Sequence, residues 1–297
     1  MSNVSNSPVT NRPGGDAPKR RTGLIVGIAI AAAAIVAAAV VIPQVIASNG
    51  AAPTGGGETA PAAGEAEYDL VTPGTLTIAT EGTYRPFSFH DESGELVGYD
   101  VEVAQAVAEK LGLKVEFAET EWAAIFAGLE GQRFDVIANQ VSINEEREEK
   151  YLLSDPYTIS PGALIVRSDN TTITSFDDLD GAKAAQSATS NWHELATSYG
   201  AVVEDVEGWN ESITLLRDGR IDFTLNDKLT FLDFVATEGA DDIKIVAETD
   251  DPSLSAFALT KANDTLTADI NAALAELAAD GTLAKIGEKY FGEDVSQ

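Results

Sequence analysis

One arginine, Arg147, stands among four glutamates at the end of the stretch "NQVSINEER", residues 139–147. The apolar run "FDVIA", residues 134–138, precedes this stretch and predicts a strand that ends in polar side chains. A guanidinium presents a fork of N–H donors that matches the two oxygens of a carboxylate. Arg147 is therefore either a clamp for an anionic group or an exposed ion pair with its glutamate neighbours, which would contribute about 0 to 1 kcal/mol to stability.

The whole chain is strongly acidic, with 19 Lys and Arg against 48 Asp and Glu and a formal net charge of −29. Such a surface repels phosphate backbones, so nucleic acid is not an expected partner. The chain has no cysteine and two histidines, His90 and His193. This composition excludes disulfides, thiolate metal sites, cysteine nucleophiles and a lipidated cysteine, and it argues against a histidine-rich metal site. We expect no cofactor and no metal.

Alternating strand and helix patterns surround the arginine. "TLTIAT", residues 75–80, reads as a strand, and Asp100 opens a predicted helix that ends before Gly112. One face of that helix carries Val101, Ala104, Ala108 and Leu111. This α/β alternation favours mainly parallel sheets covered by helices.

A weak internal repeat aligns "EWAAIFAGLEGQRFDVIANQ", residues 121–140, with "GWNESITLLRDGRIDFTLND", residues 208–227. Each unit is a predicted helix, a tight turn and a strand; the alternative is two unrelated α/β units with a common pattern. Two such units predict two lobes, and open α/β sheets bind ligands beyond the carboxyl ends of their strands. Gln140 and Asp227 occupy matching strand ends, and Asn144 and Ser190 are predicted N-caps of helices whose N-termini suit a carboxylate.

The N-terminal region is predicted to be an export segment. Residues 24–42 are 19 uncharged residues that follow "KRR" and end at Pro43. They predict a transmembrane anchor at 23–43 after a basic cytoplasmic tail at 1–22. The alternative is a cleaved signal with "VIA", residues 45–47, as its cleavage site. Both interpretations place the protein outside the cytoplasm, either on the outer face of the cytoplasmic membrane or secreted. Residues 44–73, rich in Ala, Gly, Pro, Thr and Glu, predict a disordered linker.

Four spaced blocks resemble a known family: "EGTYRPFSFHDESGELVGYDVEVAQAVAEKLG" (81–112), "SINEEREEKYLLSDPYTIS" (142–160), "DGRIDFTLND" (218–227) and "DGTLAKIGEKYFG" (280–292). They resemble the polar amino acid-binding proteins of ABC importers, the family 3 solute-binding proteins. The resemblance implies a two-lobed α/β periplasmic-binding-protein-like fold, each lobe a sheet flanked by helices. It also implies two crossing strands near 162–167 and 255–260. The implied solute-binding domain is 74–297, with lobe 1 at 74–163 and 258–297 and lobe 2 at 164–257.

The resemblance also assigns site residues. Arg147 resembles the arginine that clamps the ligand's α-carboxylate, while Thr189 and Ser190 match a loop whose N–H groups receive it; the family usually has Gly where this chain has Ala188. Groups that the resemblance places near the ligand's ammonium are the Gln140 carbonyl, the Asp227 carboxylate and the Ser142 hydroxyl, which also contacts the ligand's carboxylate. Residues expected to line the side-chain pocket and set specificity are Glu81, Tyr84, Trp122 and Asn139.

Each of four site residues also has a structural interpretation. Asp227 would be a helix N-cap, Trp122 a core residue, Tyr84 a turn-packing residue and Glu81 a solvated loop carboxylate.

The function implied is the substrate-binding component of an amino acid importer, closing by hinge bending on a polar amino acid and docking as a monomer on a membrane permease. The blocks most resemble cystine-binding members, which makes L-cystine the leading candidate. One alternative is a cyclohexadienyl dehydratase-like enzyme with Glu81 as general acid or base. The other is an amino acid-sensing ectodomain.

Overall fold

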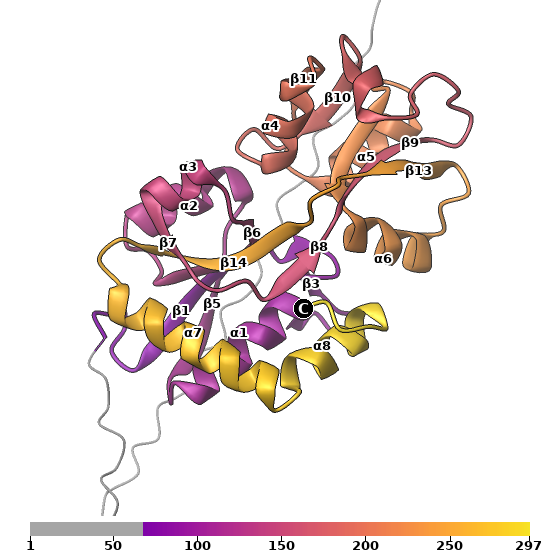
Figure 1. Ribbon diagram of the computed structural model, residues 1–297. Coiled ribbons are helices and arrows are strands. Elements are labelled where there is room, and N and C mark those ends of the chain that lie inside the picture. Colours follow the sequence, from indigo (N-terminus) through magenta and orange to yellow (C-terminus); the bar gives the residue numbers. More distant parts are fainter. Residues whose placement is uncertain (1–67) are drawn as a thin grey trace, which may run out of the picture. The chain divides into compact units, whose positions relative to one another are not determined.

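Two separate β-sheets organise residues 68–297, the part of the chain that the computed structural model describes (Figure 1). The predicted cytoplasmic tail, the anchor or signal segment and most of the linker lie outside these residues. Among the helices of residues 68–297, none has the length and apolar character needed to cross a membrane.

The first sheet has the strand order β5-β1-β6-β14-β7, with β8 paired to β14. Its strands are β1 (Thr75–Thr80), β5 (Lys114–Glu119), β6 (Val136–Ser142), β7 (Tyr151–Leu153), β8 (Thr158–Ser160) and β14 (Ser253–Thr260). β1, β5 and β6 are parallel, and β14 runs antiparallel to β6, β7 and β8. The helices of this lobe are α1 (Tyr99–Lys110), α2 (Trp122–Glu130), α3 (Glu145–Lys150), α7 (Asp264–Ala279) and α8 (Thr282–Phe291). A small antiparallel sheet joins β2 (Thr83–Tyr84), β3 (Ser88–His90) and β4 (Leu96–Val97).

The second sheet has the order β11-β10-β12-β9-β13. Its strands are β9 (Gly162–Arg167), β10 (Lys183–Gln186), β11 (Val202–Asp205), β12 (Phe223–Asp227) and β13 (Ile243–Glu248). α4 (Asn191–Ser198), α5 (Trp209–Arg217), α6 (Lys228–Glu238) and the 3₁₀ helix η1 (Phe176–Leu179) belong to this lobe. The two-lobed α/β fold expected from the sequence is therefore confirmed.

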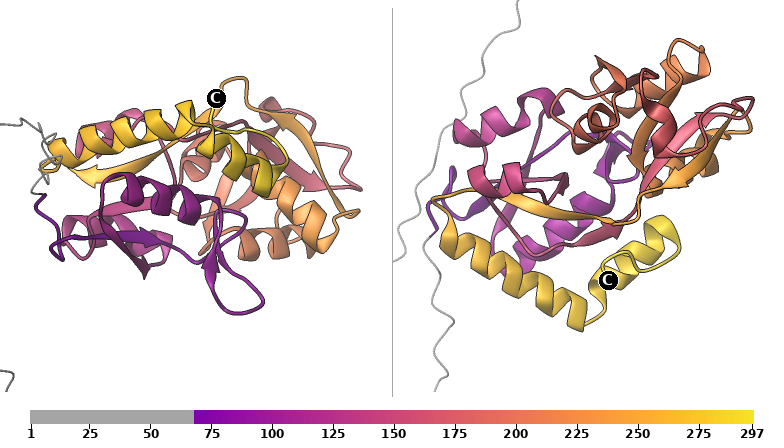
Figure 2. Two further views of the ribbon diagram at one scale, coloured as in Figure 1. Left: turned by 90° about the horizontal axis from the view of Figure 1, so that it is seen from below. Right: turned by 45° about the horizontal axis from the view of Figure 1, so that its top comes forward.

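Side chains on the two faces of the first sheet enter different apolar clusters. Leu76 and Ile78 of β1 join the cluster that includes α1, α7 and α8, whereas Ala79 joins the cluster that includes α2. This alternation is the period of two expected for a strand covered on both faces. Figure 2, left, shows α1 lying beside α7 and α8. The predicted helix that starts near Asp100 is confirmed as α1, and it ends before Gly112, whose φ of 70° suits glycine.

The chain crosses between the sheets twice (Figure 1). It leaves β8 through Pro161 to enter β9, and it returns from β13 to β14 through residues 249–252. At the first crossing, a Cβ added to Gly162 would overlap the ring of Trp192, so only glycine lets this strand pass so close to α4. The residue limits predicted for the two lobes remain proposed limits.

The two repeat units have the same local architecture. Each has a tryptophan as the first residue of its helix, Trp122 in α2 and Trp209 in α5. Asp135 Oδ2 accepts a hydrogen bond from Thr77 N (2.7 Å), and Asp222 Oδ2 accepts one from Lys183 N (2.9 Å). Both donors lie on the neighbouring parallel strand, so each aspartate fixes the start of its strand against the next one.

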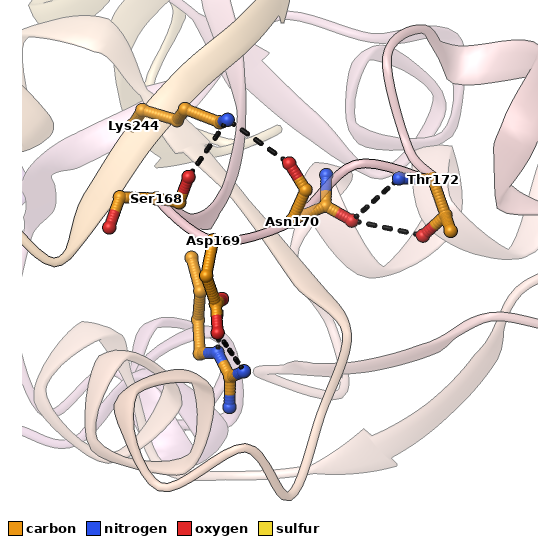
Figure 3. A network of polar contacts seen from close by, with 6 residues as sticks. Ser168, Asp169, Asn170, Thr172 and Lys244 are labelled. Atoms are coloured by element: carbon orange, nitrogen blue, oxygen red, sulfur yellow. Dashed lines mark hydrogen bonds and ion pairs between the residues drawn. The ribbon is translucent and has the colours of Figure 1, made fainter.

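The loop that follows β9 is held by a polar network (Figure 3). Lys244 Nζ donates to the carbonyl oxygens of Ser168 (3.0 Å) and Asn170 (3.1 Å), while Asn170 Oδ1 accepts from Thr172 Oγ1 (3.0 Å). Arg167, the last residue of β9, pairs with Ile243, the first residue of β13. The network therefore holds the end of the second sheet that lies farthest along β9 from the crossing at Pro161.

Candidate functional site

A cavity of about 350 Å³ lies between the two sheets, at the carboxyl ends of their parallel strands. The first lobe supplies Glu81, which follows β1, and Asn139 and Gln140 of β6. The second lobe supplies Gln186 at the end of β10 and Asn226 of β12. This is the position at which open α/β sheets hold their ligands.

Glu81 and Asn139 form one polar unit on the first-lobe wall. Asn139 Nδ2 donates to Glu81 Oε2 (2.7 Å), and Asn139 Oδ1 accepts from Glu81 N (2.9 Å). Burial raises the pKa of Glu81, and the hydrogen bond from Asn139 works in the opposite direction. Glu81 is thus a half-buried carboxylate held by its neighbours rather than a freely solvated loop residue.

Trp122 is both a core residue and a residue that lines the cavity. It is 8% exposed, it packs edge-on against Phe126 with ring centroids 5.3 Å apart, and it also lines the cavity. Its Nε1 has no hydrogen-bond partner among residues 68–297. A buried indole N–H without a partner leaves one donor available beside the cavity.

Tyr84 joins the two lobes instead of only packing a turn. Its hydroxyl donates to Asn226 Oδ1 (2.8 Å) and accepts from Thr230 Oγ1 (3.2 Å). Burial raises the pKa of Tyr84 well above its usual value, so the hydroxyl stays protonated. Next to it, Arg85 Nε lies 3.3 Å from Asp233 Oδ2 of α6, which adds an ion pair between the lobes.

Arg147 is 6% exposed and lies in the first turn of α3, where Asn144 Oδ1 accepts from Arg147 N (2.9 Å) and caps the helix as predicted. The guanidinium donates to two neutral acceptors, the carbonyl oxygens of Ser142 (2.8 Å) and Thr189 (3.3 Å). The structure gives it no ion pair with a carboxylate of the described residues, so the exposed ion pair with its glutamate neighbours is absent there. Burial lowers the pKa of Arg147 to about 10. The group remains a cation at neutral pH, and although Glu146 and Glu194 attract it from a distance, no carboxylate of the described residues forms an ion pair with it.

Arg147 and Thr189 line a second cavity, of about 700 Å³, and are not among the residues that line the first. The two cavities share Ser190 and Asn191, so they adjoin at the N-terminus of α4. Ser190 caps this helix as predicted, since its side chain accepts from His193 N (3.1 Å).

Asp227 and Ser142 line neither cavity. Asp227 Oδ1 accepts from Leu229 N (2.8 Å) and from Ser160 Oγ (2.6 Å), so the residue is the N-cap of α6. Burial raises the pKa of Asp227 to about 6. Its Oδ2 accepts no hydrogen bond from residues 68–297. The Ser142 hydroxyl accepts from Ser253 Oγ (3.0 Å), across the pairing of β6 with β14.

Sequence reasoning missed several residues that line the first cavity: Gln186, Trp192, Trp209, Asn210 and Asn226. The repeat alignment carried a signal for two of them, because Trp209 and Asn226 are the counterparts of Trp122 and Asn139.

The contacts of Asp100 were also missed, since an aspartate in a first helical turn looks like an ordinary complement to the helix dipole. Burial raises the pKa of Asp100 to about 7, and the hydrogen bonds from Gln140 work against that shift. No group of three or more His, Cys, Asp or Glu in residues 68–297 is arranged to hold a metal ion.

Comparison with known proteins gives a consistent set of relatives. L-cystine-binding protein TcyA of Bacillus subtilis (strain 168) is 48% identical over 225 residues, which cover 75% of this chain and 84% of TcyA. The solved L-cystine solute receptor of Neisseria gonorrhoeae, unliganded and open, is 47% identical with a TM-score of 0.53 and covers 75% of this chain and 94% of the receptor. An ancestral arginine-binding protein bound to arginine is 37% identical with a TM-score of 0.69, over 74% of this chain and 99% of that protein.

The arginine-bound protein has the lower sequence identity but the higher TM-score. The lobes of this chain are therefore arranged more like those of the arginine-bound protein than like those of the open, unliganded receptor. The family profile for bacterial extracellular solute-binding proteins, family 3, matches residues 76–293. On this match and these identities, the chain belongs to the family 3 extracellular solute-binding proteins.

Proposed function

We propose that this protein is the extracytoplasmic binding component of an amino acid ABC importer, and that it captures a polar amino acid, with L-cystine as the leading candidate. The observation that carries the proposal is the buried guanidinium of Arg147, which has no ion pair among the described residues and lines the second of two adjoining cavities between the lobes. A buried cation without an opposite charge is costly, and the α-carboxylate of an amino acid supplies that charge.

The proposed site spans both cavities. The ligand's carboxylate lies at Arg147 and receives the N–H group of Thr189. Ser190 N donates to Ser187 O (2.9 Å), so its N–H joins only if that hydrogen bond opens. Its ammonium faces the Gln140 carbonyl and the free Oδ2 of Asp227, with the Ser142 hydroxyl nearby. Because Asp227 and Ser142 line neither cavity, their roles require a small rearrangement of the walls when ligand enters.

The side chain of the ligand occupies the smaller cavity, beside Glu81, Tyr84, Trp122 and Asn139. Four glutamates line this cavity, Glu81, Glu121, Glu207 and Glu211, and the described residues place no lysine or arginine there. The charge favours a ligand with a second positive group and disfavours glutamate. L-cystine and arginine both carry such a group, so the charge alone does not separate them, and the named cystine-binding relatives favour L-cystine.

Closure by hinge bending follows from the contacts between the lobes. Tyr84 with Asn226 and Arg85 with Asp233 join the two lobes, and Asn226 pairs with Ala163 directly after the first crossing, so the Tyr84 contact lies close to the proposed hinge. We propose that a ligand that bridges both lobes favours the closed arrangement, in which these contacts are made. We propose that the closed form docks as a monomer on a membrane permease and that the protein acts without catalysis.

Location outside the cytoplasm agrees with the extracellular family to which the chain belongs. We propose attachment to the outer face of the cytoplasmic membrane through residues 23–43. A mass spectrum of the membrane-extracted protein tests this attachment, because an N-terminus near Ser48 would show that the segment is cleaved.

Competitive binding of L-cystine, arginine, histidine, glutamine and glutamate to the purified protein tests the ligand. We expect L-cystine to bind most tightly. If arginine or glutamine binds at least about tenfold more tightly, a difference of about 1.4 kcal/mol, the cystine assignment is wrong and only amino acid binding survives. Incubation with arogenate tests the absence of catalysis, and turnover would contradict it.

A further inference from the structure

The pairing of strand β6 with β14 is interrupted at the residues of β6 that line the cavity. Ile137 pairs with Ala258 of β14 and Val141 pairs with Ala256, so three residues of β6 face the single residue Phe257. The backbone of Phe257 bonds instead with Ser154, through Ser154 N to Phe257 O (2.9 Å) and Phe257 N to Ser154 Oγ (2.9 Å). On its other side, β6 pairs with β1 only at Val136 and Ile137. Residues 138–140 therefore form a bulge of three residues opposite one, and bulges redirect backbone and side chains beside binding sites.

Gln140 is the strained residue of this bulge. Its φ is 50°, in the left-handed region that a residue with a Cβ rarely adopts. Such a conformation persists only where surrounding contacts hold it. Both Asn139 and Gln140 line the 350 Å³ cavity, so the bulge forms part of the proposed ligand site.

Asp100 of α1 supplies the contacts that the ladder does not. Its Oδ2 accepts from Gln140 N (2.8 Å) and its Oδ1 accepts from Gln140 Nε2 (2.6 Å). Gln140 Nε2 also donates to Thr158 Oγ1 of β8 (3.0 Å), which ties the bulge to the strand that leads into the crossing. Asp100 is fully buried and is not among the residues that line either cavity, whereas Gln140, which it binds, does line the first.

We propose that Asp100 is a positioning residue of the ligand site: its carboxylate holds the β6 bulge so that the Gln140 carbonyl and the Asn139 side chain face the ligand. This inference rests on the proposed function. The inference goes beyond the proposed function because it makes the affinity for the ligand depend on a buried residue that does not touch the ligand.

Asp135 provides a matched control on the same strand. It is also a buried aspartate, directly before β6, and it accepts from two backbone N–H groups, those of Thr77 (2.7 Å) and Val71 (2.8 Å). Asp135 holds the start of β6, away from the cavity, whereas Asp100 holds the end that forms the cavity wall. Loss of either carboxylate weakens the fold, but only loss of Asp100 changes the binding surface.

The test compares Asp100→Asn with Asp135→Asn in the full chain. An asparagine offers one oxygen and one NH₂, so the Asp100→Asn side chain cannot accept from Gln140 N and Gln140 Nε2 through two separate oxygens, as the carboxylate does. We expect L-cystine and arginine, measured by calorimetry, to bind at least about tenfold more weakly to Asp100→Asn. We expect Asp135→Asn to bind within about twofold of the wild-type protein while its thermal midpoint falls at least as much. Unchanged affinity in Asp100→Asn, or an equal loss in both variants, overturns the proposal.

Amide hydrogen exchange of the wild-type protein tests the contact without any variant. The Gln140 amide has no ladder partner, so protection in the unliganded protein requires the Asp100 carboxylate, and fast exchange overturns the proposal even if Asp100→Asn does not fold. If the wild-type protein bound no amino acid, the proposed function would fail, whereas the exchange of this amide would still show whether Asp100 holds the bulge.

Discussion

Replacement of Arg147 by alanine is the most direct test of the ligand site, because this guanidinium is buried and the described residues give it no carboxylate partner. Its two hydrogen bonds go to neutral carbonyl oxygens, those of Ser142 and Thr189. Burial lowers its pKa to about 10, so it is still charged at neutral pH. We therefore expect the carboxylate of an incoming amino acid to complete a buried ion pair that the empty protein lacks.

The size of the effect follows from that missing charge. Removal of one partner from a buried ion pair costs about 3–5 kcal/mol. At about 1.4 kcal/mol for each tenfold change, Arg147→Ala is expected to weaken amino acid binding at least a hundredfold. Arg147→Lys is also expected to fail, because an ammonium lacks the fork that matches a carboxylate. Stability changes less, since the two hydrogen bonds lost, about 0.5–1.5 kcal/mol each, are offset by removal of an unpaired buried charge.

Calorimetry with L-cystine and arginine measures the affinity, and circular dichroism on heating checks the fold. Arg217→Ala is the control, because Arg217 is an arginine of the second lobe whose Nε lies 2.9 Å from Asp242 Oδ2 at the surface. We expect its affinity to match that of the wild-type protein. If Arg147→Ala also binds with wild-type affinity, the carboxylate clamp is refuted.

Three further predictions concern groups around the cavities. Burial raises the pKa of Asp227 to about 6, so its contribution to the stability of the empty fold is full below the usual pKa of 3.8 and is lost as pH rises through about 6. A ligand ammonium favours the ionised form of Asp227, so the affinity for an amino acid should rise over the same pH range and binding should release a proton from Asp227. Calorimetry in two buffers measures both effects, and both should be absent in Asp227→Asn. Tyr84→Phe removes the hydroxyl bound to Asn226 and should weaken binding by about fivefold, from about 1 kcal/mol for one hydrogen bond; an unchanged dissociation constant would contradict a closing role. Gly162→Ala should lower stability by about 1–3 kcal/mol because its Cβ overlaps Trp192, and a thermal midpoint equal to that of the wild-type protein would contradict this packing.

Local patterns were strong enough to predict most of the fold. α1 has a continuous apolar face and a glycine after its end, and the strands of the repeat units follow tight turns, so both kinds of element were visible without tertiary contacts. The cavity was also predictable, since it lies at strand ends. The N-caps Asn144 and Ser190 were found because capping depends on residues three apart in sequence.

Contacts between distant segments were not predictable in the same way. Asp100 and Gln140 are 40 residues apart, and their hydrogen bond depends on a bulge that leaves no sign in the alternation of β6. Tyr84 and Asn226 are 142 residues apart and belong to different lobes. Sequence patterns report which face of an element is buried, whereas the partner of a polar side chain is decided by how the elements come together.

The two repeat units show this division directly. Asp135 and Asp222 have the same role in their units, because each precedes a strand whose parallel neighbour presents a backbone N–H group to it. Asn139 and Asn226 also occupy equivalent strand ends, and both face the cavity. Yet Asn139 holds Glu81 of its own lobe, while Asn226 accepts from Tyr84 of the other lobe. The position on the strand therefore determines that each asparagine reaches the cavity, and the packing of the two lobes determines whether it binds its own lobe or the other one.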